Sequence, residues 1–146
     1  MELNIKKFSE LTGEEVYRIL KARHDVFIVE QNCPCEEIDG RDYGAYHVFY
    51  SDNNEIVAYL RVLDRGVVFD DVAIGRVLCL RRREGIGSRL MREGLKVAKE
   101  KFGAKKVVIE AQTYVRSMYD KLGFRQTSDE FLDHGIPHIK MELDLF

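Results

Sequence analysis

Two segments of the chain carry apolar residues at the spacing of an amphipathic helix. Thr12, followed by Glu15 three positions later, matches a capping box, and the imperfect apolar spacing behind it predicts a helix to about Ile28. The apolar residues of 86–102 follow one helix face more regularly, and Gly103 stands where a helix ends. We therefore expect two main helices.

The other apolar segments have the shorter period or the unbroken runs of strands. Residues 47–51 and 56–63 predict a hairpin, and 67–80 predict a strand that breaks near Asp70-Asp71. Residues 106–112 form an unbroken apolar run, which is typical of a strand buried on both faces. Shorter elements complete the set: a strand at 3–8, a helix from Val115 to Leu122, and strands at 124–127 and 136–145.

The order of these elements predicts the fold class. A strand–helix–strand unit over 74–112 implies a parallel pair with a right-handed crossover, whereas the hairpins imply antiparallel pairs. We therefore expect an α/β domain with a mixed, mostly antiparallel sheet flanked by helices, and not a doubly wound sheet. No repeat or linker interrupts the 146 residues, so residues 1–146 are expected to form one domain.

Composition and charge exclude several classes of protein. The formal net charge of −2 leaves no global field for a polyanion, and the aromatic residues lack a basic platform, so nucleic acid is not an expected partner. No apolar run approaches membrane-spanning length, and the segment MELNIKKFSE lacks the apolar core of a signal peptide. The odd number of cysteines, three, then favours reduced thiols and a cytoplasmic location.

The cysteines offer little metal or nucleophile chemistry. Cys33-Pro34-Cys35 could be half of a metal site, but no second close pair follows, so we expect no metal. Cys79 lies in a predicted strand, where a buried thiol is more common than an acyl-carrying nucleophile.

The stretch RRREGIGSRLM, residues 81–91, places three arginines and two glycines where the second long helix begins. A helix start exposes unpaired backbone N–H groups and a partial positive charge, and glycine lets a ligand approach the backbone. Arginine adds paired donors for phosphate. The stretch therefore predicts a pyrophosphate site, although a tight turn with solvated arginines explains residues 81–87 alone equally well.

Two other phosphate-binding motifs fit this stretch less well. A P-loop requires Gly-Lys-Ser/Thr, but Gly87 is followed by Ser88-Arg89. The dinucleotide fingerprint requires a third glycine and an acid after the second strand, but position 90 is leucine and that strand ends in Ala111-Gln112. An oxidoreductase domain that uses a dinucleotide is therefore a weak alternative.

Two motifs together resemble the GNAT superfamily of N-acetyltransferases. Residues 82–87, Arg-Arg-Glu-Gly-Ile-Gly, are similar to its Arg/Gln-x-x-Gly-x-Gly/Ala signature, and residues 119–124, Tyr-Asp-Lys-Leu-Gly-Phe, to its Tyr-x-x-Leu-Gly-Phe. A narrower resemblance, to the ElaA-like subgroup, rests on VEQNCP at 29–34, Asp39-Gly40 and DHGIPH at 133–138. The resemblance implies the acyl-CoA N-acyltransferase fold, with a splayed parallel strand pair, and acetyl-CoA as co-substrate.

The resemblance also implies which residues hold acetyl-CoA. Pyrophosphate is expected at the turn before residue 88, pantetheine along the end of the preceding strand, and Gln112 stands where many members carry asparagine. Only Arg81 separates Leu80 from Arg82, which is a shorter loop than usual, so Arg81 or Arg83 is expected to share the usual arginine's role. The expected contacts are Leu78, Cys79, Leu80, Arg81, Arg82, Arg83, Glu84, Gly85, Ile86, Gly87, Ser88, Gln112 and Tyr119.

Acetyl transfer to an amine requires an oxyanion donor, an acid for the leaving sulfur and a base for the amine. We expect the donor to be a backbone N–H of Leu78, Cys79 or Leu80. Tyr119 is the expected acid, because a phenol keeps its proton at neutral pH and its place in the motif favours this role over that of a core residue.

The base and the acceptor are less determined by the sequence. Glu110 stands in an apolar strand and His138 on the polar face of the last strand, and either is a candidate base, unless water takes the proton instead. A buried hydrogen bond or a solvated pocket wall also explains Glu110, and a solvated or structural role explains His138 equally well. Glu30 and Asp39 of the acidic loop, together with His138, are the expected acceptor contacts and favour a cationic amine.

The expected function is direct transfer of an acetyl group from acetyl-CoA to a primary amine of a small molecule or peptide, without an acyl-enzyme. The alternative is a non-catalytic acyl-CoA- or nucleotide-binding module on the same fold. The sequence leaves the oligomeric state open, including a homodimer.

Overall fold

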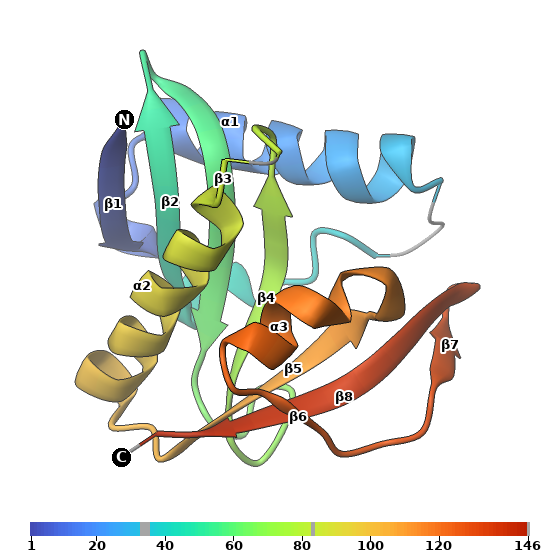
Figure 1. The fold of residues 1–146 in the computed structure, drawn as a ribbon. Helices are drawn as coiled ribbons and strands as arrows, with labels where there is room; N and C mark the ends of the chain where they lie inside the picture. The colour runs from blue at the N-terminus through green and yellow to red at the C-terminus, as the bar shows by residue number, and fades with distance from the viewer. Residues whose placement is uncertain (33–35, 83, 146) are drawn as a thin grey trace.

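The computed structural model describes residues 1–32, 36–82 and 84–145. Within these ranges eight strands form one twisted sheet in the order β1-β2-β3-β4-β5-β8-β6, with β7 paired to β8 outside this path (Figure 1). The strands are β1 (Glu2–Lys7), β2 (Tyr46–Asp52), β3 (Glu55–Leu63), β4 (Val72–Cys79), β5 (Lys106–Gln112), β6 (Arg125–Gln126), β7 (Phe131–Asp133) and β8 (Ile136–Asp144).

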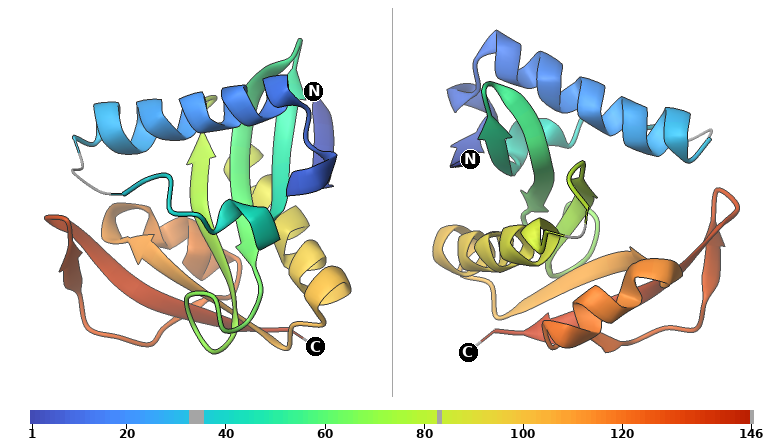
Figure 2. Two further views of the ribbon diagram at one scale, coloured as in Figure 1. Left: turned by 180° about the vertical axis from the view of Figure 1, so that it is seen from behind. Right: turned by 45° about the horizontal axis from the view of Figure 1, so that its top comes forward.

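Helices cover both faces of the sheet. Helix α1 (Gly13–Arg23) lies on one face, and α2 (Ile86–Phe102) and α3 (Arg116–Lys121) lie on the other (Figures 1 and 2). The 3₁₀ segments η1 (Phe8–Glu10), η3 (Asp42–Gly44) and η4 (Thr113–Val115) complete the connections.

The start of α1 confirms the predicted capping box, whereas its end differs from the expectation. The Thr12 side chain accepts from the Glu15 N–H, and the Glu15 carboxylate accepts from the Thr12 N–H. Beyond Arg23 the chain continues as a π-helical segment, η2 (His24–Glu30), which apolar spacing alone does not distinguish from an α-helix. The imperfect spacing of this region was the signal of the change in winding.

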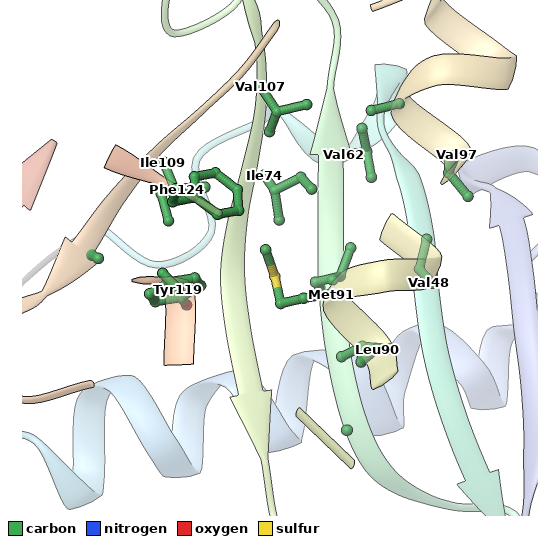
Figure 3. Close-up of a cluster of buried hydrophobic side chains, with 14 of the residues drawn as sticks. Val48, Val62, Ile74, Leu90, Met91, Val97, Val107, Ile109, Tyr119 and Phe124 are labelled. Atoms are coloured by element: carbon green, nitrogen blue, oxygen red, sulfur yellow. The ribbon is translucent and has the colours of Figure 1, made fainter. Parts of the chain in front are cut away.

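The main core lies between the sheet and the helices α2 and α3. Its buried side chains include Ile74, Leu90, Met91 and Ile109 (Figure 3). A Cβ on Gly94 would lie 2.9 Å from the Leu60 side chain, so glycine is what lets α2 approach β3 this closely. A smaller core on the α1 face contains Ile19, Phe49, Tyr59 and Leu78.

The parallel pair splays, as expected. Strands β4 and β5 pair only at Val72–Val107 and Ala73–Val108, although β4 runs on to Cys79. Beyond this point β5 is held on its other side by β8, with which it pairs along its full length. We call the region between the unpaired parts of the two strands, 74–79 and 109–112, the splay; Figure 2 shows the strands diverging there. The predicted mixed α/β sheet is confirmed.

Two strand predictions require correction. Residues 67–71 precede β4 as a turn, in which the Gly66 N–H donates to the Phe69 carbonyl at 2.7 Å, and are not part of a strand. Strand β7 was missed, since a three-residue strand shows too little alternation to be recognised. In the part of the chain that the structure describes, no helix is both long and apolar enough to span a bilayer.

Candidate active site

The first turn of α2 presents bare backbone amides beside the splay. Gly85 is the N-cap residue with φ 71°, a left-handed conformation that favours glycine. No side chain caps the helix, and among the described residues the N–H groups of Ile86, Gly87 and Ser88 have no protein acceptor. Four such orphan donors normally begin a helix, and a phosphate can satisfy them.

There is also room for a ligand at this turn, which we call the glycine turn (residues 84–88). Among the described residues, a Cβ added at Gly85 would meet nothing within 4 Å, and one at Gly87 would meet only the Met118 sulfur at 3.4 Å. Glu84 is exposed. The described part of the chain therefore neither caps nor crowds the amides for which the sequence predicted an anion.

The arginines before the glycine turn point in different directions. The Arg81 guanidinium pairs with Asp52 of the β2–β3 hairpin at 2.7 Å and not with the turn. Arg82 pairs with Glu30 at the end of η2 at 2.5 Å, so a predicted phosphate contact meets a predicted acceptor contact. Both partners are largely exposed, and such pairs exchange readily. Arg83 lies outside the described residues.

The end of β4 supplies fewer free amides than predicted. The Leu80 N–H donates to the Val57 carbonyl at 2.8 Å. Because hydrogen-bonded pairs alternate along an antiparallel ladder, Leu78 opposite Tyr59 is also a bonded pair, whereas Cys79 opposite Ala58 is not. Of the three alternatives predicted for the amide donor, Leu78 and Leu80 are therefore already paired with β3.

Cys79 is left as the donor at the strand end. Its N–H faces away from β3 and into the splay. The Cys79 thiol donates to the Arg81 carbonyl at 3.1 Å, so it is not positioned as a free nucleophile.

Tyr119 lies on α3, 6% exposed, with its ring edge-on to Phe124 (Figure 3). Its hydroxyl makes no hydrogen bond within the described residues. Burial, and to a smaller extent the nearby Tyr114, raises the pKa of Tyr119 to about 12. The phenol therefore stays protonated at neutral pH, as an acid must.

The candidate bases share one face of the sheet. In the β5–β8 register Glu110 faces Lys140 and Gln112 faces His138, and residues two apart on a strand point to the same side. Desolvation by the surrounding chain, followed by the negative charge of Asp133, raises the pKa of Glu110, although the residue as a whole is exposed.

His138 is nearly buried and not solvated as its polar neighbours suggested. It is 9% exposed, its ring stacks on Phe131, and its Nδ1 lies 2.7 Å from the Ile136 carbonyl. Because a carbonyl only accepts, Nδ1 carries the proton of the neutral ring and Nε2 keeps a basic lone pair.

Gln112 joins β5 to the end of η2. Its amide exchanges hydrogen bonds with that of Gln31, at 3.0 and 3.4 Å. Together with the Glu30–Arg82 pair, this contact places the end of η2 over both sides of the splay.

The acids of the loop after residue 36 are already paired. Three arginines and three acids alternate in a largely buried array, the arginine–acid network: Arg23, Arg61, Arg76, Glu37, Asp39 and Asp42. Asp39 lies 2.6 Å from Arg61, and although burial opposes ionisation, the hydrogen bonds and charge of Arg61 lower the pKa of Asp39. Asp39, which the sequence predicted as an acceptor contact, is thus already bound to Arg61 and Arg76.

The sequence held a signal for this network. Arg61 and Arg76 interrupt the apolar runs IVAYLRVL and VAIGRVL, where an unpaired charge would be costly. No group of His, Cys, Asp or Glu suited to a metal is present in residues 1–32, 36–82 and 84–145, and Cys33 and Cys35 lie outside these ranges.

A splayed parallel pair beside an uncapped helix start defines the class of acyl-CoA N-acyltransferases. Residues 9–145 match the family model described as an acetyltransferase (GNAT) domain, and the chain belongs to this family.

Proteins similar over nearly the whole chain agree with this assignment. A UPF0039 protein of Schizosaccharomyces pombe is 36% identical over 99% of this chain and 98% of its own. Protein ElaA of Escherichia coli is 36% identical over 91% of this chain and 90% of its own, and its crystal structure superposes with a TM-score of 0.89. An acyl-CoA N-acyltransferase of Pseudomonas aeruginosa is 33% identical, covers 97% of this chain and 99% of its own, and has a TM-score of 0.90. The resemblance to ElaA is thus confirmed.

Proposed function

We propose that this protein transfers the acetyl group of acetyl-CoA to a primary amine by direct attack within a ternary complex. The observation that carries the proposal is the set of unpaired N–H groups at Ile86, Gly87 and Ser88 beside the splay. A diphosphate satisfies such amides and the positive end of α2, while the splay leaves the edge of β4 free for a pantetheine chain.

Each chemical requirement has a residue. Arg82 leaves Glu30 for the diphosphate, and Gln112 borders the pantetheine path. The Cys79 N–H donates to the carbonyl oxygen as negative charge develops there. Tyr119 gives its proton to the departing sulfur.

The base acts from the face shared by Glu110 and His138. His138 offers Nε2 with a fixed tautomer, and Glu110 offers a carboxylate of raised pKa, so either takes the proton of an ammonium directly or through water. The acceptor is a small-molecule or peptide amine, and the site of action is the cytoplasm.

The test is release of coenzyme A from acetyl-CoA in the presence of a panel of amines: polyamines, aminosugars, amino acids and short peptides. We expect at least one amine to accelerate release well above hydrolysis, with the acetylated amine detected by mass spectrometry. Thermal shifts with acetyl-CoA, NAD and ATP run in parallel, because a ligand that binds only the native state raises Tm.

Two results would contradict the proposal in different ways. A thermal shift with acetyl-CoA, together with no release of coenzyme A for any amine of the panel, would favour a non-catalytic acyl-CoA-binding module. A larger shift with NAD or ATP than with acetyl-CoA would exclude coenzyme A as the ligand of the glycine turn.

A further inference from the structure

Arg76 has a backbone conformation that its residue type disfavours. Its φ is 51°, in the left-handed region, in the middle of β4. The other described non-glycine residues with positive φ lie outside the strands: Asn32, Asn53, Asn54 and His134. A left-handed backbone is unfavourable for a residue that carries a Cβ, so contacts elsewhere must hold Arg76 in place.

The Arg76 side chain is held by the loop at residues 36–39. Its Nε lies 2.5 Å from a Glu37 carboxylate oxygen, and its Nη2 reaches the carbonyls of Glu36 and Glu37 at 3.3 and 3.2 Å and Asp39 at 3.5 Å. Within the described residues the Nε has no well-aligned acceptor, so the contact with Glu37 is ionic.

The two acids cannot follow Arg76 if it moves. Glu37 is also bound by Arg23, at 2.5 Å, and Asp39 by Arg61, at 2.6 Å. Both carboxylates are less than a tenth exposed, and a buried carboxylate that loses a cation is strongly destabilised. The guanidinium of Arg76 is therefore fixed relative to the arginine–acid network.

The backbone of Arg76 determines which amides face the splay. Strand β3 pairs Tyr59 with Leu78 and Arg61 with Gly75, so Leu60 faces two residues of β4, Arg76 and Val77. This is a β-bulge with one extra residue. Without it the register beyond would slip by one residue, and the Cys79 N–H would turn from the splay toward β3.

We propose that Arg76 is a positioning residue for acetyl transfer: its ion pairs with Glu37 and Asp39 hold the bulge that turns the Cys79 N–H toward the thioester carbonyl. The inference rests on the proposed function. Arg76 acts through the backbone and touches neither substrate.

The carbonyl stretch of acetyl-CoA bound to the protein, measured by infrared difference spectroscopy, reports the N–H donor without any acceptor amine. In the wild type we expect a lower frequency than for free acetyl-CoA. In Arg76→Ala and Arg76→Gly the carbonyl frequency should return toward the value of free acetyl-CoA. In Arg76→Lys it should lie between the wild-type and free values, because lysine keeps the positive charge but lacks the paired N–H donors of the guanidinium.

The kcat values of the Arg76 variants should change in the same order as their carbonyl frequencies. With the best amine of the panel, kcat should fall by about 10²-fold, the typical effect of losing one oxyanion donor, while the Kd of acetyl-CoA changes little because the glycine turn is intact. Arg65→Ala is the control. Arg65 is exposed and donates to the Phe102 carbonyl, and its substitution removes one positive charge, as Arg76→Ala does.

The variants also distinguish a folding defect from a change in the orientation of the Cys79 N–H. Arg76→Gly removes the side chain but tolerates positive φ, so it carries the test if Arg76→Ala unfolds. Wild-type carbonyl frequency and kcat in Arg76→Gly and Arg76→Lys would overturn the inference and leave the proposed function standing. A wild type that binds no acetyl-CoA would overturn both.

Discussion

The two sides of the splay differ in which groups form them: backbone amides on the cofactor side and paired charged side chains on the acceptor side. The cofactor side is bare backbone: an uncapped helix start, two glycines and a strand edge, with few charges in place. The acceptor side stands on the arginine–acid network, in which Arg23 is fully buried and each acid meets at least two arginines. The comparison teaches that unsatisfied backbone marks a ligand site here, whereas a dense group of charges marks a scaffold that satisfies itself.

Substitution of Arg23 should have the largest effect, a loss in the free energy of unfolding. Arg23→Ala leaves Glu37 and Asp42 buried without their main cation, and removal of one partner of a buried pair costs about 3–5 kcal/mol. Urea unfolding followed by circular dichroism measures the free energy of unfolding. Arg18→Ala removes a partly exposed arginine of the same helix and should change the free energy of unfolding far less. Equal losses in the two variants would mean that the network is not the scaffold of the acceptor side.

Tyr119→Phe should separate catalysis from binding on the cofactor side. The hydroxyl has no partner among the described residues, so its removal should leave stability nearly unchanged. If Tyr119 is the acid, kcat should fall by about 10²-fold while the Kd of acetyl-CoA stays the same. The pKa of about 12 predicts no loss of wild-type activity from tyrosine ionisation up to about pH 10. Unchanged kcat would remove Tyr119 from the mechanism.

Arg82→Ala should weaken coenzyme A without weakening pantetheine. A charge-assisted contact to phosphate predicts about a tenfold rise in the Kd of coenzyme A, measured by calorimetry. Pantetheine, which lacks the diphosphate, should bind both proteins alike. Glu30→Gln is the matched variant: it frees Arg82 from its present partner and should tighten coenzyme A slightly. Equal losses for both ligands would move the anion contact elsewhere.

The smallest expected effect is a pH dependence of stability from His47. His47 is 1% exposed; its Nε2–H donates to the Asp42 carbonyl at 3.0 Å and its Nδ1 accepts from the Tyr59 hydroxyl at 2.7 Å. Burial lowers the pKa of His47 below its ordinary 6.5, so the unfolded chain binds the proton more readily.

Stability should therefore be complete above pH 6.5 and decline as the pH falls below it. His47→Gln should flatten this part of the profile, as measured by the free energy of unfolding between pH 7.5 and 5. The lowered pKa of Asp39 acts in a separate window, since its contribution is present above 3.8 and is lost only below that value. If His47→Gln keeps the wild-type pH dependence of the free energy of unfolding between pH 7.5 and 5, His47 does not titrate in that range.

The sequence by itself determined the elements and the cofactor side. Capping at Thr12, the regular apolar face of 86–102 and the buried run of 106–112 are local patterns, and they predicted α1, α2 and β5. The glycine turn was predictable for the same reason, because glycines at a helix start act through a few successive residues.

Tertiary structure alone decided the acceptor side and the orientation of the amides. Asp39 was predicted to contact the acceptor because its partners, Arg61 and Arg76, lie elsewhere in the chain. The N–H of Cys79 faces the splay only because β4 bulges opposite Leu60, and register is a property of two strands, not of one. Charge pairing and register depend on contacts distant in sequence, so a local pattern can indicate that Arg61 and Arg76 need partners but cannot specify which residues those are.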